Sequence, residues 1–277
     1  MAPSLAILGV FVIWPILASF WYSLHDWTVG AAVQPWVGLN NYVKVLHDDR
    51  FWGALVNTLE LTVVSVVILI VLGLLIALAL MRDGIGNRIV RSVFFFPTVV
   101  SLTSIGLVWR FLLDPNIGLV GGVMQALGLP AVGWLQSTSL ALPTIIFVDI
   151  WKNAGFVMII LLAGLKGVPA ERYEAGRLDG AGEWQLLRFI TIPSIRPTML
   201  FATLILTIQS LQLFDLVYVM TGGGPVFTTD TLVTQIFREG FVNFDMGYAS
   251  ALSWILFLLI MLISALQLRF FRYNDVD

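Results

Sequence analysis

Residues 171–183 read ERYEAGRLDGAGE, and they lie between two long apolar runs. Six of these thirteen residues are charged, in a chain with only 12% charged residues in all. Charged side chains are costly in hydrocarbon, so a run this dense is expected to lie outside a membrane. We call residues 166–196, which contain it, the polar segment. It separates apolar sequence that is long enough to span a bilayer on both sides.

The polar segment has the pattern of two short helices joined by a turn. Pro169 suits the first turn of a helix, and Glu171 and Glu174 favour its N-terminal end. The glycines that follow are expected to end this helix, and a second short helix is predicted over 183–190. An ordinary solvated loop is the alternative. A connection of about 30 residues is longer than most, which favours a function for the segment.

Composition places the chain in a membrane. Of its 277 residues, 58% are hydrophobic, and the mean hydropathy is +0.92. Soluble domains have about 25% charged residues, roughly twice the content found here. The net charge of −2 gives no reason to expect a nucleic-acid partner. The chain has no cysteine, and His25 and His47 stand apart, so no disulfide, metal site or cysteine nucleophile is predicted.

Six apolar stretches are long enough to cross a bilayer, which takes about 20 residues in a helix. They are expected to be helices because backbone groups have no water to bond in hydrocarbon. The predicted spans are 4–24, 61–81, 92–112, 141–165, 197–220 and 246–268. The first has no basic flank or small-residue cleavage site, so we interpret it as a retained span rather than a signal peptide. A short cytoplasmic leader before it is left open as an alternative.

The fold class that follows is an all-α membrane protein with six transmembrane helices in one domain, 1–277. Its orientation is predicted from the Lys and Arg residues. With the N-terminus in the cytoplasm, ten of the fifteen lie in cytoplasmic segments and five lie on the outer side or at outer helix ends. Both termini and the polar segment are therefore predicted to face the cytoplasm. In the first outer loop, a short amphipathic helix is predicted around 40–46.

The residues of the polar segment resemble a known signature. Residues 174–181 read EAGRLDGA and are followed by Phe189, Ile192-Pro193 and Pro197. This pattern resembles the EAA signature of ATP-binding-cassette (ABC) importer permeases, usually E-A-A-x-x-D-G-A and then I-x-L-P. The chain departs from it at Gly176, where Ala is usual, and at Ile192, where Leu is commonest before the proline. Gly176 is expected to loosen the helix slightly.

The resemblance extends over most of the chain. Motifs similar to those of carbohydrate-uptake permeases are VGLNNY at 37–42, FFP at 95–97, TGGGP at 221–225 and GYASA at 247–251. The pattern is that of the first of two paired permeases, the maltose-permease-F-like or glycerol-phosphate-permease-A-like type. This resemblance implies a type I ABC importer permease fold in the bacterial inner membrane.

In that family the permease has no catalytic site. It pairs with a second, different permease, rests on a dimer of ABC ATPases that bind ATP and Mg, and receives solute from an extracytoplasmic solute-binding protein. No cofactor or metal is expected on this chain itself. The polar segment would be the ATPase-coupling element, with Glu174 making a polar contact and Asp179 bracing the turn. The residues that the resemblance assigns to coupling are Glu171, Glu174, Ala175, Gly176, Asp179, Gly180, Ala181 and Pro193.

Polar side chains inside spans usually face a bundle interior or a wet cavity. Such positions are candidates for a pathway for sugars, which are bound by hydrogen bonds and aromatic faces. The predicted pathway residues are Trp151, Asn153, Gln209, Gln212 and Asp215. The alternative for the two glutamines is that they bridge helices. Asp149 and Lys152, three residues apart on one helix face, are interpreted as a structural ion pair rather than a substrate clamp.

Two rival functions are weaker. A self-sufficient secondary transporter is disfavoured because the chain shows few buried charges and no inverted repeat. An intramembrane enzyme is disfavoured because both histidines lie outside the spans. The glycines at 222–224 lack the G-K-[ST] of a phosphate-binding loop. The sequence leaves the solute open among sugars, oligosaccharides and glycerol phosphates, and the lack of a strongly basic cavity slightly favours a neutral one.

Overall fold

A computed structural model describes the backbone of residues 2–273 and the side chains of residues 4–270. Helices account for the architecture, and two isolated bridges, His25 to Trp36 and Thr28 to Asp245, are the only β-type pairings in this part of the chain. The all-α prediction is confirmed. The first half contains α1 (Ala2–Leu8), π-helix η1 (Gly9–Ile13), α2 (Trp14–Ser23), α3 (Asn40–Leu46), α4 (Asp49–Ala79), α5 (Ile85–Val99), α6 (Leu102–Leu112) and α7 (Leu119–Ala126).

The second half starts with the long helix α8 (Ala141–Lys166) and ends with α15 (Met246–Tyr273). Between them lie α9 (Ala170–Leu178), α10 (Glu183–Leu186), π-helix η2 (Leu187–Thr191), α11 (Ile192–Ser194), α12 (Arg196–Leu211), α13 (Asp215–Met220), α14 (Leu232–Phe237) and π-helix η3 (Arg238–Val242). The amphipathic helix predicted at 40–46 is confirmed as α3.

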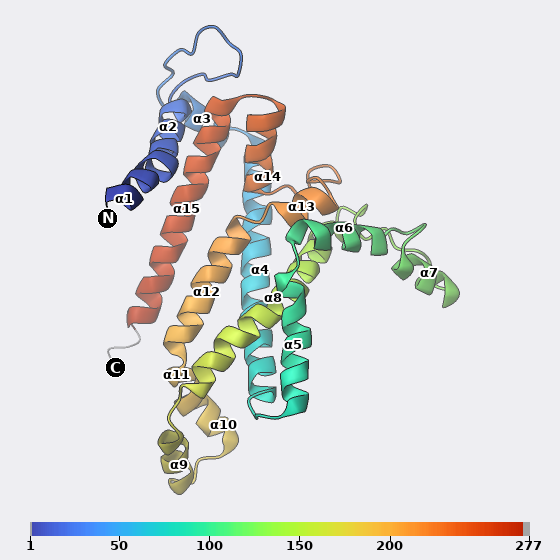
Figure 1. The fold of residues 1–277 in the computed structure, drawn as a ribbon. Coiled ribbons are helices and arrows are strands. Elements are labelled where there is room, and N and C mark those ends of the chain that lie inside the picture. The colour runs from blue at the N-terminus through green and yellow to red at the C-terminus, as the bar shows by residue number, and fades with distance from the viewer. Residues whose placement is uncertain (1, 274–277) are drawn as a thin grey trace.

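Four helices in the described chain are long and apolar enough to span a membrane without a break: Ser4–Ser23, Asp49–Ala79, Ala141–Lys166 and Met246–Phe270. Two bent helix pairs bring the number to six if each is one span. In Figure 1, α9 and α10 lie at one end of the bundle, and α3, α14 and the loop between α2 and α3 lie at the opposite end. The described end of α15 lies toward the same end as α9.

The prediction of one continuous helix over 92–112 is wrong. α5 ends at Val99, α6 begins at Leu102, and the two axes meet at 97°. Pro97 lies inside the last turn of α5 and has no N–H to donate to the carbonyl four residues earlier. Val100, with ψ of 141°, then leaves the helix in an extended conformation.

The prediction of one helix over 197–220 is also wrong. α12 ends at Leu211, and three non-helical residues precede α13. No proline or glycine lies at this break. At the break, the N–H of Leu213 makes a tight turn to the Ser210 carbonyl (3.2 Å), and the Leu213 carbonyl lies 3.5 Å from the hydroxyl of Thr231. At its other end, α12 follows the helices at Glu183–Ser194 after a 66° bend.

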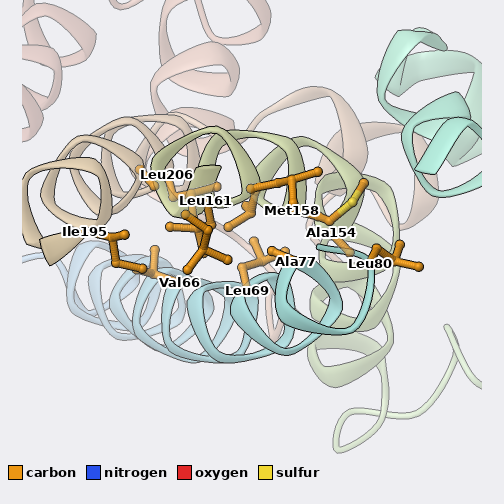
Figure 2. Packing of buried hydrophobic residues seen from close by; sticks show 13 residues of the cluster. Val66, Leu69, Ala77, Leu80, Ala154, Met158, Leu161, Ile195 and Leu206 are labelled. Atoms are coloured by element: carbon orange, nitrogen blue, oxygen red, sulfur yellow. The ribbon is translucent and has the colours of Figure 1, made fainter. Parts of the chain in front are cut away.

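The largest packed core lies between α4, α8 and α12, and Figure 2 shows its interlocking side chains. Lipid is as apolar as these side chains, so close packing rather than transfer from water holds the helices together. A Cβ at Gly73 on α4 would lie 2.6 Å from the Val157 side chain on α8, so this glycine lets the two helices approach. Gly164 allows α12 the same approach to α8, because a Cβ there would lie 2.8 Å from the hydroxyl oxygen of Thr198.

Candidate coupling segment and solute pocket

α9 ends in a turn that depends on glycine. Gly180 has φ of +81°, a left-handed conformation that glycine adopts without steric cost. Its N–H donates to the Arg177 carbonyl (3.1 Å), and the Ala181 N–H donates to the Gly176 carbonyl (2.9 Å). These two bonds form a Schellman motif, which satisfies carbonyls that the helix end would leave open. The predicted helix and turn are both present.

The second half of the polar segment is a chain of short helices rather than one helix over 183–190. α10, η2 and α11 follow one another from Glu183 to Ser194, with a π-helical turn in the middle. The start of α10 is capped locally, because the Gly182 N–H donates to the side-chain oxygen of Gln185 (2.8 Å). The helix–turn–helix arrangement is therefore as predicted. We call α9 its first arm and the run from Glu183 to Ser194 its second arm, which is longer than predicted.

Gly176 is where the two arms touch. A Cβ at this position would lie 2.7 Å from Cδ1 of Ile190 and 2.8 Å from Cδ2 of Leu186. The glycine therefore serves close packing between α9 and the second arm. Its effect is to bring the arms together, which gives a physical reason for the departure from the usual Ala.

Polar contacts fasten the arms to each other. Arg172 donates to the Ser194 hydroxyl (3.0 Å), and the hydroxyls of Tyr173 and Thr191 lie 3.2 Å apart. An exposed ion pair between Arg177 and Glu183 (3.5 Å) adds little, as exposed pairs usually do. The segment is thus a folded unit with its own internal contacts.

Three large apolar side chains project from this otherwise polar unit. Leu178 is 89% exposed, Trp184 70% and Phe189 67%. The described residues of the chain leave them uncovered. Apolar groups gathered in one polar segment are typical of a protein-binding surface.

Five of the eight predicted coupling residues line two grooves. One groove, of about 460 Å³, is lined by Ala175, Gly176, Asp179 and Pro193 together with Phe189. A second, of about 520 Å³, contains Glu174 and lies between α9, the second arm and the end of α4. The remaining predicted residues lie outside both grooves: Glu171, Gly180 and Ala181.

A separate, open pocket of about 430 Å³ is bounded by α8 and by the two helix breaks. We call it the α8–α12 pocket. Four of the five predicted pathway residues line it: Asn153, Gln209, Gln212 and Asp215. The fifth, Trp151, lies outside the pocket and packs edge-on against Trp109, with ring centres 5.5 Å apart. Two polar lining residues, Thr98 and Ser210, were not predicted. For Thr98, the neighbouring Pro97 was the one sequence signal, because a proline can end a helix next to a cavity.

The predicted ion pair between Asp149 and Lys152 is not formed. Both side chains line the α8–α12 pocket, but one carboxylate oxygen of Asp149 accepts from Asn153 (2.8 Å), and the other, although buried, has no hydrogen-bond partner. The Asn153 amide, one turn further along α8, takes the place that the ammonium was expected to hold. Within residues 2–273, no group of three His, Asp or Glu side chains is placed to hold a metal ion.

The comparison with known families decides the identity of this arrangement. Residues 69–275, which include the α8–α12 pocket and the polar segment, match the family model described as binding-protein-dependent transport system inner membrane component. The chain belongs to this family. It is a permease subunit of ABC import, an integral component of the inner membrane.

Curated relatives and solved structures agree with the assignment. The permease is 33% identical to the probable ABC transporter permease protein YurN of Bacillus subtilis over 98% of this chain and 94% of the relative. It is 33% identical to the trehalose/maltose transport system permease protein MalF of Thermococcus litoralis, over 98% and 92%. A bacterial ABC transporter involved in the import of the acidic polysaccharide alginate has the same fold, with a TM-score of 0.85, 26% identity, and coverage of 98% of this chain and 93% of that one. The type I permease fold is thereby confirmed.

At the end opposite the polar segment, the permease contains an ionic cluster that sequence reasoning missed. Asp230, only 2% exposed, receives two hydrogen bonds from Arg238, at 2.7 and 3.0 Å. Asn57 on α4 donates to the Asp230 carbonyl (2.9 Å). The Phe227 ring lies under the guanidinium groups of both Arg50 (4.5 Å) and Arg238 (4.9 Å). The cluster fixes the 221–231 loop to α4 and to the start of η3.

A second polar cluster joins the end of α8, which leads into the polar segment, to the loop between α4 and α5. Lys166, the last residue of α8, donates to the carboxylate of Asp83 (2.6 Å), which lies between α4 and α5. This hydrogen bond lowers the pKa of Asp83 below its usual value. Arg91 lies near the same carboxylate (3.5 Å) and also donates to the carbonyls of Leu80 and Arg82.

Proposed function

We propose that this permease forms half of a translocation pathway for a carbohydrate and is driven by a separate ABC ATPase dimer that docks on the polar segment. The other half of the pathway would come from a second, different permease. An extracytoplasmic solute-binding protein would deliver the solute. The names of relatives support the carbohydrate class, since one is a trehalose/maltose permease and a structural neighbour imports alginate.

The observation that carries the ATPase proposal is the exposure of three large apolar side chains, Leu178, Trp184 and Phe189, on the folded polar segment. A loop that merely connected two spans would not be expected to expose three large apolar side chains on a folded helical hairpin. Docking would bury them against the ATPase. ATP and Mg would be bound by the ATPase, and the permease would contribute no catalytic group.

The proposed roles follow from the geometry of the hairpin. Gly180 and Ala181 form its turn, Gly176 sets the spacing of its arms, and Asp179 lies at the exposed tip. Coupling requires that ATP-dependent contacts differ between the inward- and outward-facing states. The surface residues proposed for those contacts are Glu171, Glu174, Ala175, Asp179 and Pro193.

The α8–α12 pocket is the proposed solute site. Gln209 and Gln212 line it, and their side-chain amides make no hydrogen bond to a described residue, which supports solute contact over the bridging alternative. Asn153 and Asp215 add an amide and a carboxyl group to the same lining. A volume of about 430 Å³ falls in the range of small-molecule sites. Amide and carboxyl groups suit the hydroxyl groups of a sugar.

The orientation proposed is cytoplasmic for both termini and for the polar segment. A chain without cysteine offers a clean background for testing it. Single cysteines at Leu178 and at Asn243, both exposed and at opposite ends of the bundle, should react differently with a membrane-impermeant maleimide in intact cells. We expect labelling at 243 only. Labelling at 178 before permeabilisation would contradict the orientation.

The ATPase proposal is tested with Glu174→Lys, which reverses one charge on the exposed side of α9. The variant should insert in the membrane normally but lose ATPase co-purification and uptake. Asp26→Lys, at an exposed site outside the membrane-spanning helices and away from the polar segment, is a control for the same charge reversal. Normal solute-stimulated ATP hydrolysis in Glu174→Lys would contradict the proposal, and uptake by the isolated chain without an ATPase would support a secondary transporter instead.

A further inference from the structure

The charges in the α8–α12 pocket bear on the kind of carbohydrate that can occupy it, provided that the pocket is the solute site proposed above. Family membership leaves this open, since the solved alginate importer handles an acidic polysaccharide. The pocket of this permease is lined by one ammonium group, from Lys152, and by two carboxyl groups, from Asp149 and Asp215.

Lys152 alone would invite an anionic solute, because its side chain lines the pocket and no ion pair joins it to a described carboxylate. Asp149 lies three residues earlier on α8, on the same face of the helix and in the same pocket. One oxygen of its carboxyl group is buried with no hydrogen-bond partner. The positive charge of Lys152 is therefore opposed by the nearby carboxyl group of Asp149, whose hydrogen bonding is incomplete.

Asp215 acts from the other wall. It is exposed at the start of α13, and its only hydrogen bond from a described side chain is a long one from Thr103 (3.4 Å). A solute anion drawn to Lys152 would also approach Asp215 and Asp149. Like charges repel, so both carboxyl groups oppose the approach of a solute anion. The amides of Asn153, Gln209 and Gln212 carry no charge to offset it.

We infer that the α8–α12 pocket selects uncharged polyhydroxyl solutes and excludes anionic ones, with Asp149 and Asp215 as the specificity-determining residues. Lys152 then acts as a hydrogen-bond donor to a hydroxyl group rather than as an anion site. Acidic sugars and glycerol phosphates fall outside the accepted class.

The test uses two probes that differ only in charge: maltitol, which is neutral, and maltobionate, in which one terminal CH₂OH is replaced by a carboxylate. Equilibrium dialysis with the assembled importer in lipid nanodiscs, without solute-binding protein, measures the ratio of the dissociation constants of maltobionate and maltitol. We expect a ratio of about ten or more, since one unfavourable charge contact inside a protein is worth at least that factor.

Variants should move this ratio in opposite directions. Asp149→Asn and Asp215→Asn leave Lys152 less compensated and should lower the ratio, while Lys152→Gln should raise it. Asp149→Asn can still accept from Asn153, and Asp215 is exposed, so both variants should fold. Asp26→Asn removes an exposed carboxylate at the opposite end of the bundle and is the matched control, expected to leave the ratio unchanged.

The outcomes separate this inference from the proposed function. Equal affinity for both probes, or a ratio that none of the three pocket variants moves, would overturn the charge selection while leaving the pocket as a solute site. Failure of both probes to bind, in the wild type and in all variants, would overturn the solute role of the pocket and the charge selection with it.

Discussion

The turn at Gly180 offers a test of the polar segment that separates backbone strain from side-chain contact. A Cβ at this position would meet no atom within 4 Å, so a larger side chain has room. The obstacle is the backbone, because φ of +81° is a conformation that β-branched residues rarely adopt. We therefore compare Gly180→Val with Gly180→Asn, since Asn tolerates this region.

A left-handed conformation costs an ordinary residue about 1–2 kcal/mol, and this value sets the size of the effect. If docking of the ATPase requires the Schellman turn, Gly180→Val should weaken the affinity of the ATPase by about five- to thirty-fold. Gly180→Asn should stay close to wild type. The assay is titration of purified ATPase onto the permease complex in nanodiscs, followed by surface plasmon resonance and by solute-stimulated hydrolysis.

Two results would refute the reasoning. If Gly180→Asn were as damaging as Gly180→Val, the position would be sensitive to any side chain, and contact rather than strain would explain the defect. If Gly180→Val bound the ATPase like wild type, the turn would not be needed for docking. Thermal unfolding of each variant is the control, since a local change at an exposed tip should leave the melting temperature of the bundle nearly unchanged.

Three further predictions concern the bundle and its two polar clusters. Gly73→Leu should overpack the contact with Val157 and destabilise the protein by about 1–3 kcal/mol in detergent melts, whereas Gly53→Leu, at an open site on the same helix, should not. Arg238→Met should cost about 3–5 kcal/mol by leaving Asp230 buried without its partner, and the double variant with Asp230→Leu should recover part of this loss in the same melts. The pKa of Asp83 is lowered in the folded state, so Asp83 should contribute stability that is fully present above about pH 4 and lost as the pH falls through the lowered value. Loss of its contact with Lys166 should speed hydrogen exchange around residue 166. This faster exchange should appear at low pH in the wild type and already at pH 7 in Asp83→Asn.

Local sequence signals predicted the elements whose causes are local. α3 begins and ends where its pattern said, and Pro169 and Gly180 delimit α9 through first-turn and C-terminal preferences that depend on neighbouring residues only. Composition was enough to predict a membrane protein, because soluble domains have about twice the content of charged residues found here. These are the levels at which the sequence and the structure agree most closely.

The breaks and clusters depend on residues far apart in the chain. Pro97 is a local helix-breaking residue that the predicted span 92–112 did not take into account. The 97° turn that follows it leads into α6, which packs against α13, more than 100 residues later in the chain. The break after Leu211 contains no proline or glycine that would signal it, and the contact it makes is distant in sequence, from the Leu213 carbonyl to the hydroxyl of Thr231, eighteen residues later. The Asp149–Lys152 interpretation failed for a related reason: helical spacing shows that two groups can meet, but Asn153 was an equally placed competitor.

The two unpredicted breaks point to one mechanical arrangement. Non-helical backbone inside a membrane is tolerated where it lines a cavity or is buried in protein, and both breaks lie at the α8–α12 pocket. α12 runs from the end of the polar segment to the second break, about 24 Å for its 16 residues. α8 runs from the pocket residues at 149–153 to Lys166, where the polar segment begins. The polar segment is thus held between the ends of two rigid helices whose other parts form opposite walls of the pocket. A displacement of the segment is expected to move both walls together, which would allow an event at the surface of the membrane to reach a site in its interior.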